Sequence, residues 1–125
     1  MERDGRQQAV FQWARETFGE AASTPSERAL RLLEEAIELA QAEGVALDRV
    51  TAVAEHVYLK PAGQPEQEAG GVGLTLLAYC ESRGFSADGA EERELERVLA
   101  IDPAHFRERH NRKADVGIAA RAPEE

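Results

Sequence analysis

The chain has 125 residues, enough for one domain with a hydrophobic core and too few for two. Its 24 acidic and 15 basic residues give a formal charge of −9, which argues against a surface that binds nucleic-acid polymers or anionic membranes. The single cysteine excludes a disulfide within the chain, and neither a signal-peptide segment nor an apolar run of membrane-spanning length is present, so we expect a cytoplasmic protein.

Every periodic segment has the spacing of a helix, and none has the alternation of a strand, so we predict an all-α fold. Capping residues mark several ends: Gly19 ends the first helix, and Thr24 with Pro25 begins the second. The predicted helices cover approximately residues 6–18, 25–43, 47–59, 65–83, 87–100 and 103–113. We expect a single domain over residues 1–125, with a flexible tail from about residue 118.

The second predicted helix carries an acidic motif, Glu34, Glu35 and Glu38. The apolar residues around it predict a buried helix; they are Ala29, Leu30, Leu33, Ala36, Ile37 and Ala40. Residues three or four apart share a helix face, so each like-charged pair costs roughly 0.2–0.5 kcal/mol. A hard divalent cation with oxygen ligands would offset this repulsion. The alternative is a solvated acidic edge of an amphipathic helix.

Glycines interrupt the middle of the fourth predicted helix at Gly70, Gly71 and Gly73. Each interior glycine costs a helix about 1 kcal/mol relative to alanine. Gly70 and Gly73 would let another backbone approach, so we expect close packing against another helix or a partner chain, with a local helix break as the alternative. Glu68 precedes these glycines and is the best candidate for a further metal ligand, against the alternative of a surface residue.

Basic residues gather on the last predicted helix, where they can bind phosphate oxygens or pair with Glu91, Glu92 and Glu94. They are Arg107, Arg109, Arg112 and Lys113, with Asn111 among them. Trp13 is suited to stacking on a base or to a place in the core, and Lys60 begins a turn that we expect to cover a site. The predicted nucleotide-binding residues are Lys60, Arg107, Asn111, Lys113 and Trp13.

Other sites find less support in the sequence. No histidine follows a glutamate by three residues, which argues against the Glu-x-x-His motif of di-iron bundles. Cys80 lies in an apolar run, so we predict a small buried hydrophobic residue there rather than a reactive thiol.

Several motifs occur together in this chain. They are Trp13-x-x-x-x-Phe18-Gly19, the run from Glu27 to Gln41 that contains Glu34-Glu-Ala-Ile-Glu38, Val57-Tyr-x-Lys-Pro-x-Gly63, and Gln67-Glu-x-Gly-Gly-Val-x-x-Thr-Leu76. Over about residues 11–113 the combination resembles the MazG-like group of all-α nucleoside triphosphate pyrophosphohydrolases. That group is marked by Glu-Glu-x-x-Glu followed by Glu-x-x-Asp.

The resemblance implies Mg²⁺, or Mn²⁺ in its place, held by glutamates, and water attack that yields a nucleoside monophosphate and pyrophosphate. Glu35 and Glu38 match the metal pair, and Glu68 matches the first residue of Glu-x-x-Asp. Glu34 matches the extra glutamate of the group, and we choose it as the general base. Gly71 stands where the group has Asp, which leaves one coordination position to water or another carboxylate.

We therefore expect a MazG-like helical bundle that dimerises through its helices and hydrolyses a nucleotide with Mg²⁺. The expected partners are a nucleotide and a second copy of the chain, without nucleic-acid polymers or membranes. The alternative is an oligomeric or nucleotide-sensing module of the same fold that has lost activity, because Gly71 replaces the usual Asp.

Overall fold

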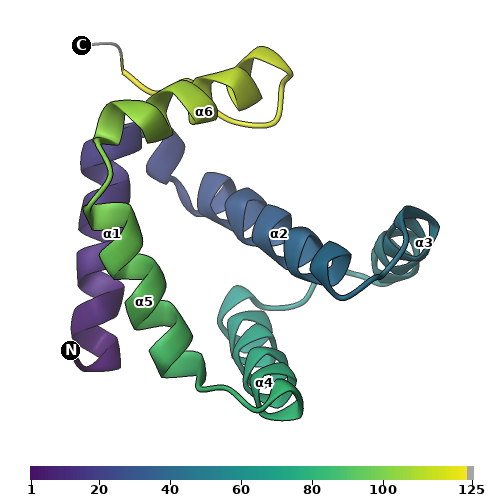
Figure 1. Ribbon diagram of the computed structural model, residues 1–125. Coiled ribbons are helices and arrows are strands. Elements are labelled where there is room, and N and C mark those ends of the chain that lie inside the picture. Colours follow the sequence, from purple (N-terminus) through teal and green to yellow (C-terminus); the bar gives the residue numbers. More distant parts are fainter. Residues whose placement is uncertain (124–125) are drawn as a thin grey trace. The chain divides into compact units, whose positions relative to one another are not determined.

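The computed structural model describes residues 1–123, and all regular structure in this range is helical, which confirms the all-α prediction (Figure 1). The elements are α1 (Arg3–Phe18), the 3-10 turn η1 (Ala21–Ser23), α2 (Pro25–Ala42), α3 (Leu47–Tyr58), α4 (Pro65–Arg83), α5 (Ala87–Leu99) and α6 (Pro103–Asp115). The helices lie where the sequence predicts them, although η1 was not predicted. No helix among residues 1–123 is both long enough and apolar enough to cross a membrane.

The helix ends follow the capping chemistry of the sequence. The Glu27 amide donates to Thr24 Oγ1 over 3.4 Å before α2, and the Ala104 amide donates to Asp102 Oδ1 over 2.9 Å at the start of α6. These side chains satisfy amide groups that have no partner within the helix. Gly84 ends α4 with a φ of 77°, in the left-handed region that glycine adopts without a Cβ clash.

Contacts divide the chain into two compact units, where the sequence predicts one domain. The first unit contains Met1–Glu34 and the chain from Ala90 onward, and the second unit contains Glu35–Gly89. Helix α2 begins in the first unit and ends in the second.

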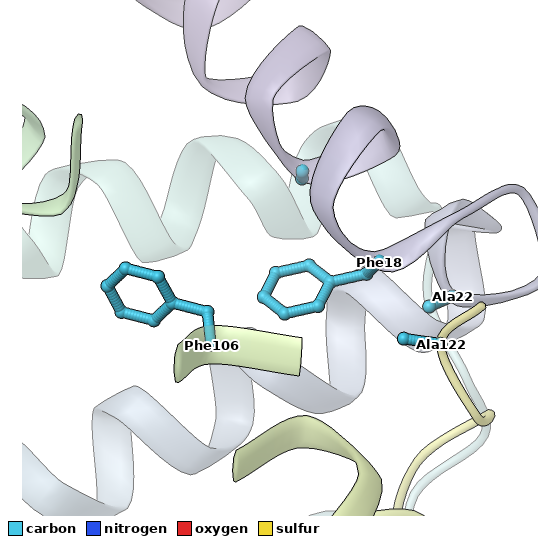
Figure 2. Close-up of a cluster of buried hydrophobic side chains, with 5 residues drawn as sticks. Phe18, Ala22, Phe106 and Ala122 are labelled. Carbon is cyan, nitrogen blue, oxygen red and sulfur yellow. The ribbon is translucent and has the colours of Figure 1, made fainter. Parts of the chain in front are cut away.

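The first unit has a hydrophobic core built on α1, η1, α6 and the segment after α6. Its buried members are Ala14, Phe18, Ala22, Phe106 and Ala122, four of which are labelled in Figure 2. Trp13 lies against this core with its ring edge-to-face to Phe18 and Phe106, at centroid distances of 5.5 and 5.3 Å. Such aromatic pairs add to the stabilisation that comes from burial alone.

The segment after α6 is fastened to the first unit. The Ala122 amide donates to Asn111 Oδ1 over 2.6 Å, His110 Nε2 bonds to the carbonyl of Ala120, and Ala122 itself is buried. The sequence predicts a flexible tail from about residue 118, and these contacts involve residues of that segment. The last two residues of that predicted tail, 124–125, lie outside the described residues.

The second unit buries one residue, Cys80, as the sequence predicts for this thiol. Many of its large apolar side chains are exposed, namely Ile37, Leu39, Val45, Leu47, Val53, Val57, Tyr58, Leu59, Val72, Leu74, Leu77 and Phe85. The predicted burial of α2 is wrong for the single chain, because none of its residues is buried. The helical period correctly predicts an apolar face, but no neighbour among residues 1–123 buries it.

Candidate functional site

The acidic motif lies on one continuous helix. Glu34, Glu35 and Glu38 all belong to α2, so the predicted spacing of three and four residues is present in the structure. Glu35 and Glu38 are exposed, whereas Glu34 is half-buried. The three carboxylates therefore differ in their surroundings although they are close in sequence.

Glu34 is held by two cations of the first unit. Lys113 Nζ on α6 lies 2.7 Å from Glu34 Oε1, and Arg31 Nη1, one turn earlier on α2, lies 3.2 Å from the same oxygen. The side chains of Lys113 and Glu34 are 28% and 27% exposed, and that of Arg31 is 13% exposed. Arg31 also donates to the backbone carbonyl of Ile118, which fixes its guanidinium.

Glu68 lies in the first turn of α4, where the unpaired amides of a helix N-terminus favour a negative charge. Its carboxylate is close to the preceding turn: a Cβ at Gly63 would lie 3.3 Å from Glu68 Oε2. A side chain at position 63 would therefore require Glu68 to move.

The second unit joins the ends of α2 and α4 through Glu43. Tyr79 Oη donates to Glu43 Oε2 over 2.7 Å, and Arg83 Nε lies 2.9 Å from the same oxygen. Bonding to the Glu43 carboxylate raises the pKa of the Tyr79 hydroxyl. A helix rises by about 1.5 Å per residue. Glu38 therefore lies roughly 8 Å from Glu43 along the direction of α2, and Glu68 lies roughly 16 Å from Tyr79 along α4.

Among residues 1–123 the structure does not gather three His, Cys, Asp or Glu side chains into a group that could hold a metal ion. The available donors still fit magnesium chemistry, because Mg²⁺ commonly binds one or two carboxylates and completes its shell with water and substrate phosphates. Glu35 and Glu38, exposed on one turn, offer two such carboxylates. Their assignment as metal ligands, and that of Glu68, stays a prediction.

The glycines of α4 face open space in the single chain. A Cβ built at Gly70, Gly71 or Gly73 would meet nothing within 4 Å. The predicted close packing of Gly70 and Gly73 is therefore not made within the chain, and α4 continues through them without a break. Packing against a partner chain stays a prediction, and position 71 has room for the Asp of the MazG-like pattern.

The acidic residues of α5 pair with arginines other than those predicted on the last helix. Glu91 binds Arg6 of α1 at 2.6 Å, and Glu92 binds the same guanidinium at 3.4 Å. Glu94 pairs with Arg97, one turn along α5, and this hydrogen bond lowers the pKa of the Glu94 carboxyl. On α6, Lys113 pairs with Glu34 and Arg112 pairs with Glu108.

The predicted nucleotide-binding residues are distributed over both units. Lys60 is exposed in the turn after α3, in the second unit. In the first unit, Arg107 is half-buried on α6, Asn111 holds the Ala122 amide, and Lys113 holds Glu34. Trp13 packs against Phe18 and Phe106, as the core alternative anticipates. Contacts of these residues with a nucleotide stay predictions.

His110 is a buried residue that the sequence analysis did not single out. It is 3% exposed, its ring lies 4.7 Å from that of Phe18, and burial is the main cause that lowers its pKa. Its position four residues after Phe106 places both on the buried face of α6, and this spacing was the available signal.

One surface hollow lies along α1, and no predicted site residue lines it. Its lining is Gln8, Phe11, Gln12, Arg15, Glu16 and Glu20. Comparison of the chain with protein families, curated proteins and solved structures finds no match. The acidic motif on α2 and the cations around Glu34 are therefore the features on which a function has to be argued.

Proposed function

We propose that the protein is a Mg²⁺-dependent nucleotide pyrophosphohydrolase that cleaves a nucleoside triphosphate to the monophosphate and pyrophosphate. The observation that carries the proposal is the Glu-Glu-x-x-Glu motif on an unbroken helix, with Glu35 and Glu38 exposed one turn apart. Two carboxylates in this arrangement suit a cation that also binds substrate phosphates.

In this reaction Glu35 and Glu38 would hold the ion, and Glu68 would contribute a further carboxylate. The chemistry that Mg²⁺ would supply there is neutralisation of phosphate charge and a lower pKa of a bound water. Glu34 accepts the proton of the attacking water, and its carboxylate is oriented by Arg31 and Lys113. Lys60, Arg107, Asn111 and Trp13 stay the nucleotide-binding residues that the sequence predicts.

We further propose that the active form is a dimer in which the second unit packs against its copy. Large apolar side chains exposed on α3 and α4 support this, among them Leu47 at 78% and Leu74 at 70%. Large apolar side chains left exposed in a single chain can mark an interaction site. The open faces of Gly70 and Gly73 would then allow a helix of the partner to approach closely.

Gly71 favours the alternative function, a nucleotide-sensing or purely oligomeric module with this fold. The MazG-like pattern has Asp at this position, and an exposed glycine offers no ligand. In the enzyme, water or a carboxylate from elsewhere fills the corresponding coordination position. In the alternative, the nucleotide or the ion binds without hydrolysis, or neither binds.

A panel of nucleoside triphosphates tests the proposal, with Mg²⁺ or Mn²⁺ present and pyrophosphate and orthophosphate measured separately. We expect pyrophosphate from at least one nucleotide, and no release by the Glu38→Gln variant. Nucleotide binding without release would support the sensing module. Absence of both binding and release would leave only the oligomeric module.

A further inference from the structure

Two arginines at the start of α2 have buried nitrogen atoms without a hydrogen-bond partner. Arg28 Nη2 and Arg31 Nε are both buried, and neither has a partner among residues 1–123. Oε2 of Glu27 is also buried without a partner in this range, so this oxygen satisfies neither guanidinium group. A buried donor that is left unsatisfied is costly, and more so on a charged group. The two arginines are three residues apart and therefore share one face of the helix.

The acidic residues near these arginines do not balance the positive charge. Glu34 is shared between Lys113 and Arg31, which lie 2.7 and 3.2 Å from one of its oxygens. Burial and then the charge of Arg31 lower the pKa of Arg28, and Glu27 acts in the opposite direction. Three permanent cations thus lie near two carboxylates, which leaves an excess of positive charge in a partly buried position.

His110 adds a further donor beside the arginines. Its ring lies 4.7 Å from that of Phe18, and the guanidinium carbon of Arg28 lies 5.6 Å from the centre of the same ring. Burial lowers the pKa of His110 the most, and three cations near the ring lower it further, namely Arg31, Arg28 and Lys113. These three cations and His110 therefore form one basic cluster within the first unit.

The segment after α6 supplies oxygen atoms to the basic cluster. The Ile118 carbonyl accepts a hydrogen bond from Arg31, and the Ala120 carbonyl bonds to His110 Nε2. A carbonyl only accepts, so Nε2 carries the proton. Two acceptors that are two residues apart in the chain thus meet donors of the cluster, as two oxygens of one oxyanion would. The segment is held there because Ala122 is buried.

We propose that the basic cluster is a binding site for a phosphate oxyanion, and that the carbonyls of Ile118 and Ala120 occupy it until the ligand displaces them. Guanidinium groups bind phosphate oxygens through strong charge-assisted bonds. Such a ligand would give the buried nitrogens of Arg28 and Arg31 the partners that the described chain does not provide. We choose pyrophosphate as the ligand, and this choice rests on the proposed function, in which it is the product.

Calorimetric titration of the full chain with pyrophosphate, without metal or nucleotide, tests the site. We expect the parent to bind, and the Arg28→Gln and Arg31→Gln variants to bind at least tenfold more weakly, because each loses charge-assisted bonds to the ligand. Arg109→Gln is the matched control, since it removes the same charge from an exposed position on α6. Its affinity should stay within twofold of that of the parent.

A variant of the segment after α6 tests whether this segment covers the site. Ala122 is 3% exposed, so the larger side chain of Ala122→Gln does not fit and should release the segment. We expect at least a threefold gain in affinity for pyrophosphate. In NMR spectra of the parent, pyrophosphate should shift the ring signals of His110, and those of His105, exposed on the same helix, should not move.

Absence of binding in both the parent and Ala122→Gln would overturn the site, and so would full affinity in Arg28→Gln or an equal loss in Arg109→Gln. Unchanged affinity in Ala122→Gln would overturn the covering role of the segment. A non-hydrolysable nucleoside triphosphate that binds more tightly than pyrophosphate would assign the site to substrate phosphates and overturn the choice of product. Hydrolysis is measured separately, so release of pyrophosphate without binding at the cluster would overturn this inference and leave the proposed function standing.

Discussion

The two units of this chain bury their apolar residues to very different degrees. The first unit has a core of five buried residues, with Trp13 and other apolar side chains packed around it. The second unit contains three helical segments with apolar faces, yet among its residues only Cys80 is buried. Both units are built from helices, so helical structure by itself does not distinguish them.

This contrast indicates how each unit is stabilised. Helices of ordinary length are marginal in water unless an apolar face packs against something. In the first unit, α1, α6 and the segment that ends near Ala122 supply that surface to one another. In the second unit, α3 and α4 need a surface from outside the unit, and we propose that a second copy supplies it.

Truncating a core side chain should lower the free energy of unfolding the most, and this loss distinguishes the first unit from the second. Phe18→Ala should lower the free energy of unfolding by about 3–5 kcal/mol, because it leaves a cavity at a site that is 9% exposed. Leu74→Ala removes a side chain that is 70% exposed and should cost little in the dissociated chain. Denaturant unfolding measured at low and high protein concentration checks both variants. Equal losses at both concentrations for Leu74→Ala would contradict the dimer.

Replacing a glycine of α4 with a larger residue tests whether the second unit packs against a copy of itself. A side chain at Gly73 meets nothing within 4 Å in the single chain, so Gly73→Leu should not strain the monomer. Across a dimer it would overpack the contact at a cost of about 1–3 kcal/mol. Analytical ultracentrifugation should show dissociation, whereas Gly44→Asn, at an open position with positive φ, should leave association unchanged. A Gly73→Leu protein that stays associated would show that the glycines are not at the interface.

The next test compares two glutamates of α2, Glu34 in the first unit and Glu38 in the second. Glu38→Gln should weaken Mg²⁺ binding at least tenfold, which is about 1.4 kcal/mol. It should also raise the stability of the metal-free protein by roughly 0.2–0.5 kcal/mol for each repulsive pair relieved. Glu34→Gln should change Mg²⁺ affinity less than twofold, because Lys113 already compensates Glu34. Calorimetry checks both variants, and equal losses of affinity would contradict the different roles of these glutamates.

The sequence predicted the helices well because their signals are local. Thr24, Asp102 and Gly84 act through bonds and angles within one turn, and the structure places them at the predicted ends. The burial of Cys80 was also predicted correctly from its apolar neighbours. Helix faces follow from spacing alone, but what covers a face depends on contacts between distant segments.

The contacts that the sequence did not predict join such distant segments. The pairing of Lys113 with Glu34 joins residues far apart in sequence, and neither spacing nor composition indicates it. The same holds for the bond between Asn111 and the Ala122 amide, which fastens a segment that was expected to be flexible. Nothing in the sequence indicates the pairing of Arg6, whose buried guanidinium binds Glu91 and links α1 with α5.

The smallest expected effect concerns pH and the core of the first unit. Burial lowers the pKa of His110 below its ordinary value of 6.5, and the nearby charges of Arg31, Arg28 and Lys113 lower it further, while the bond to the Ala120 carbonyl acts in the opposite direction. Between the two pKa values the unfolded chain binds more protons than the folded chain at this residue. The contribution of His110 to stability is therefore fully present above about pH 6.5 and is lost as the pH falls below it.

Replacing His110 with Gln should reduce the loss of stability between about pH 7 and pH 5, since the titrating group is removed while an amide can still donate to the Ala120 carbonyl. His105→Gln is the control, because His105 is exposed on the same helix. Thermal unfolding across this range measures the slope, and an NMR titration of the ring protons gives the pKa of His110 directly. A His110 that titrates at or above its ordinary value of 6.5 would show that the core of the first unit admits the charged ring. The contrast between the units would then be weaker than the burial of Phe18 and Phe106 indicates.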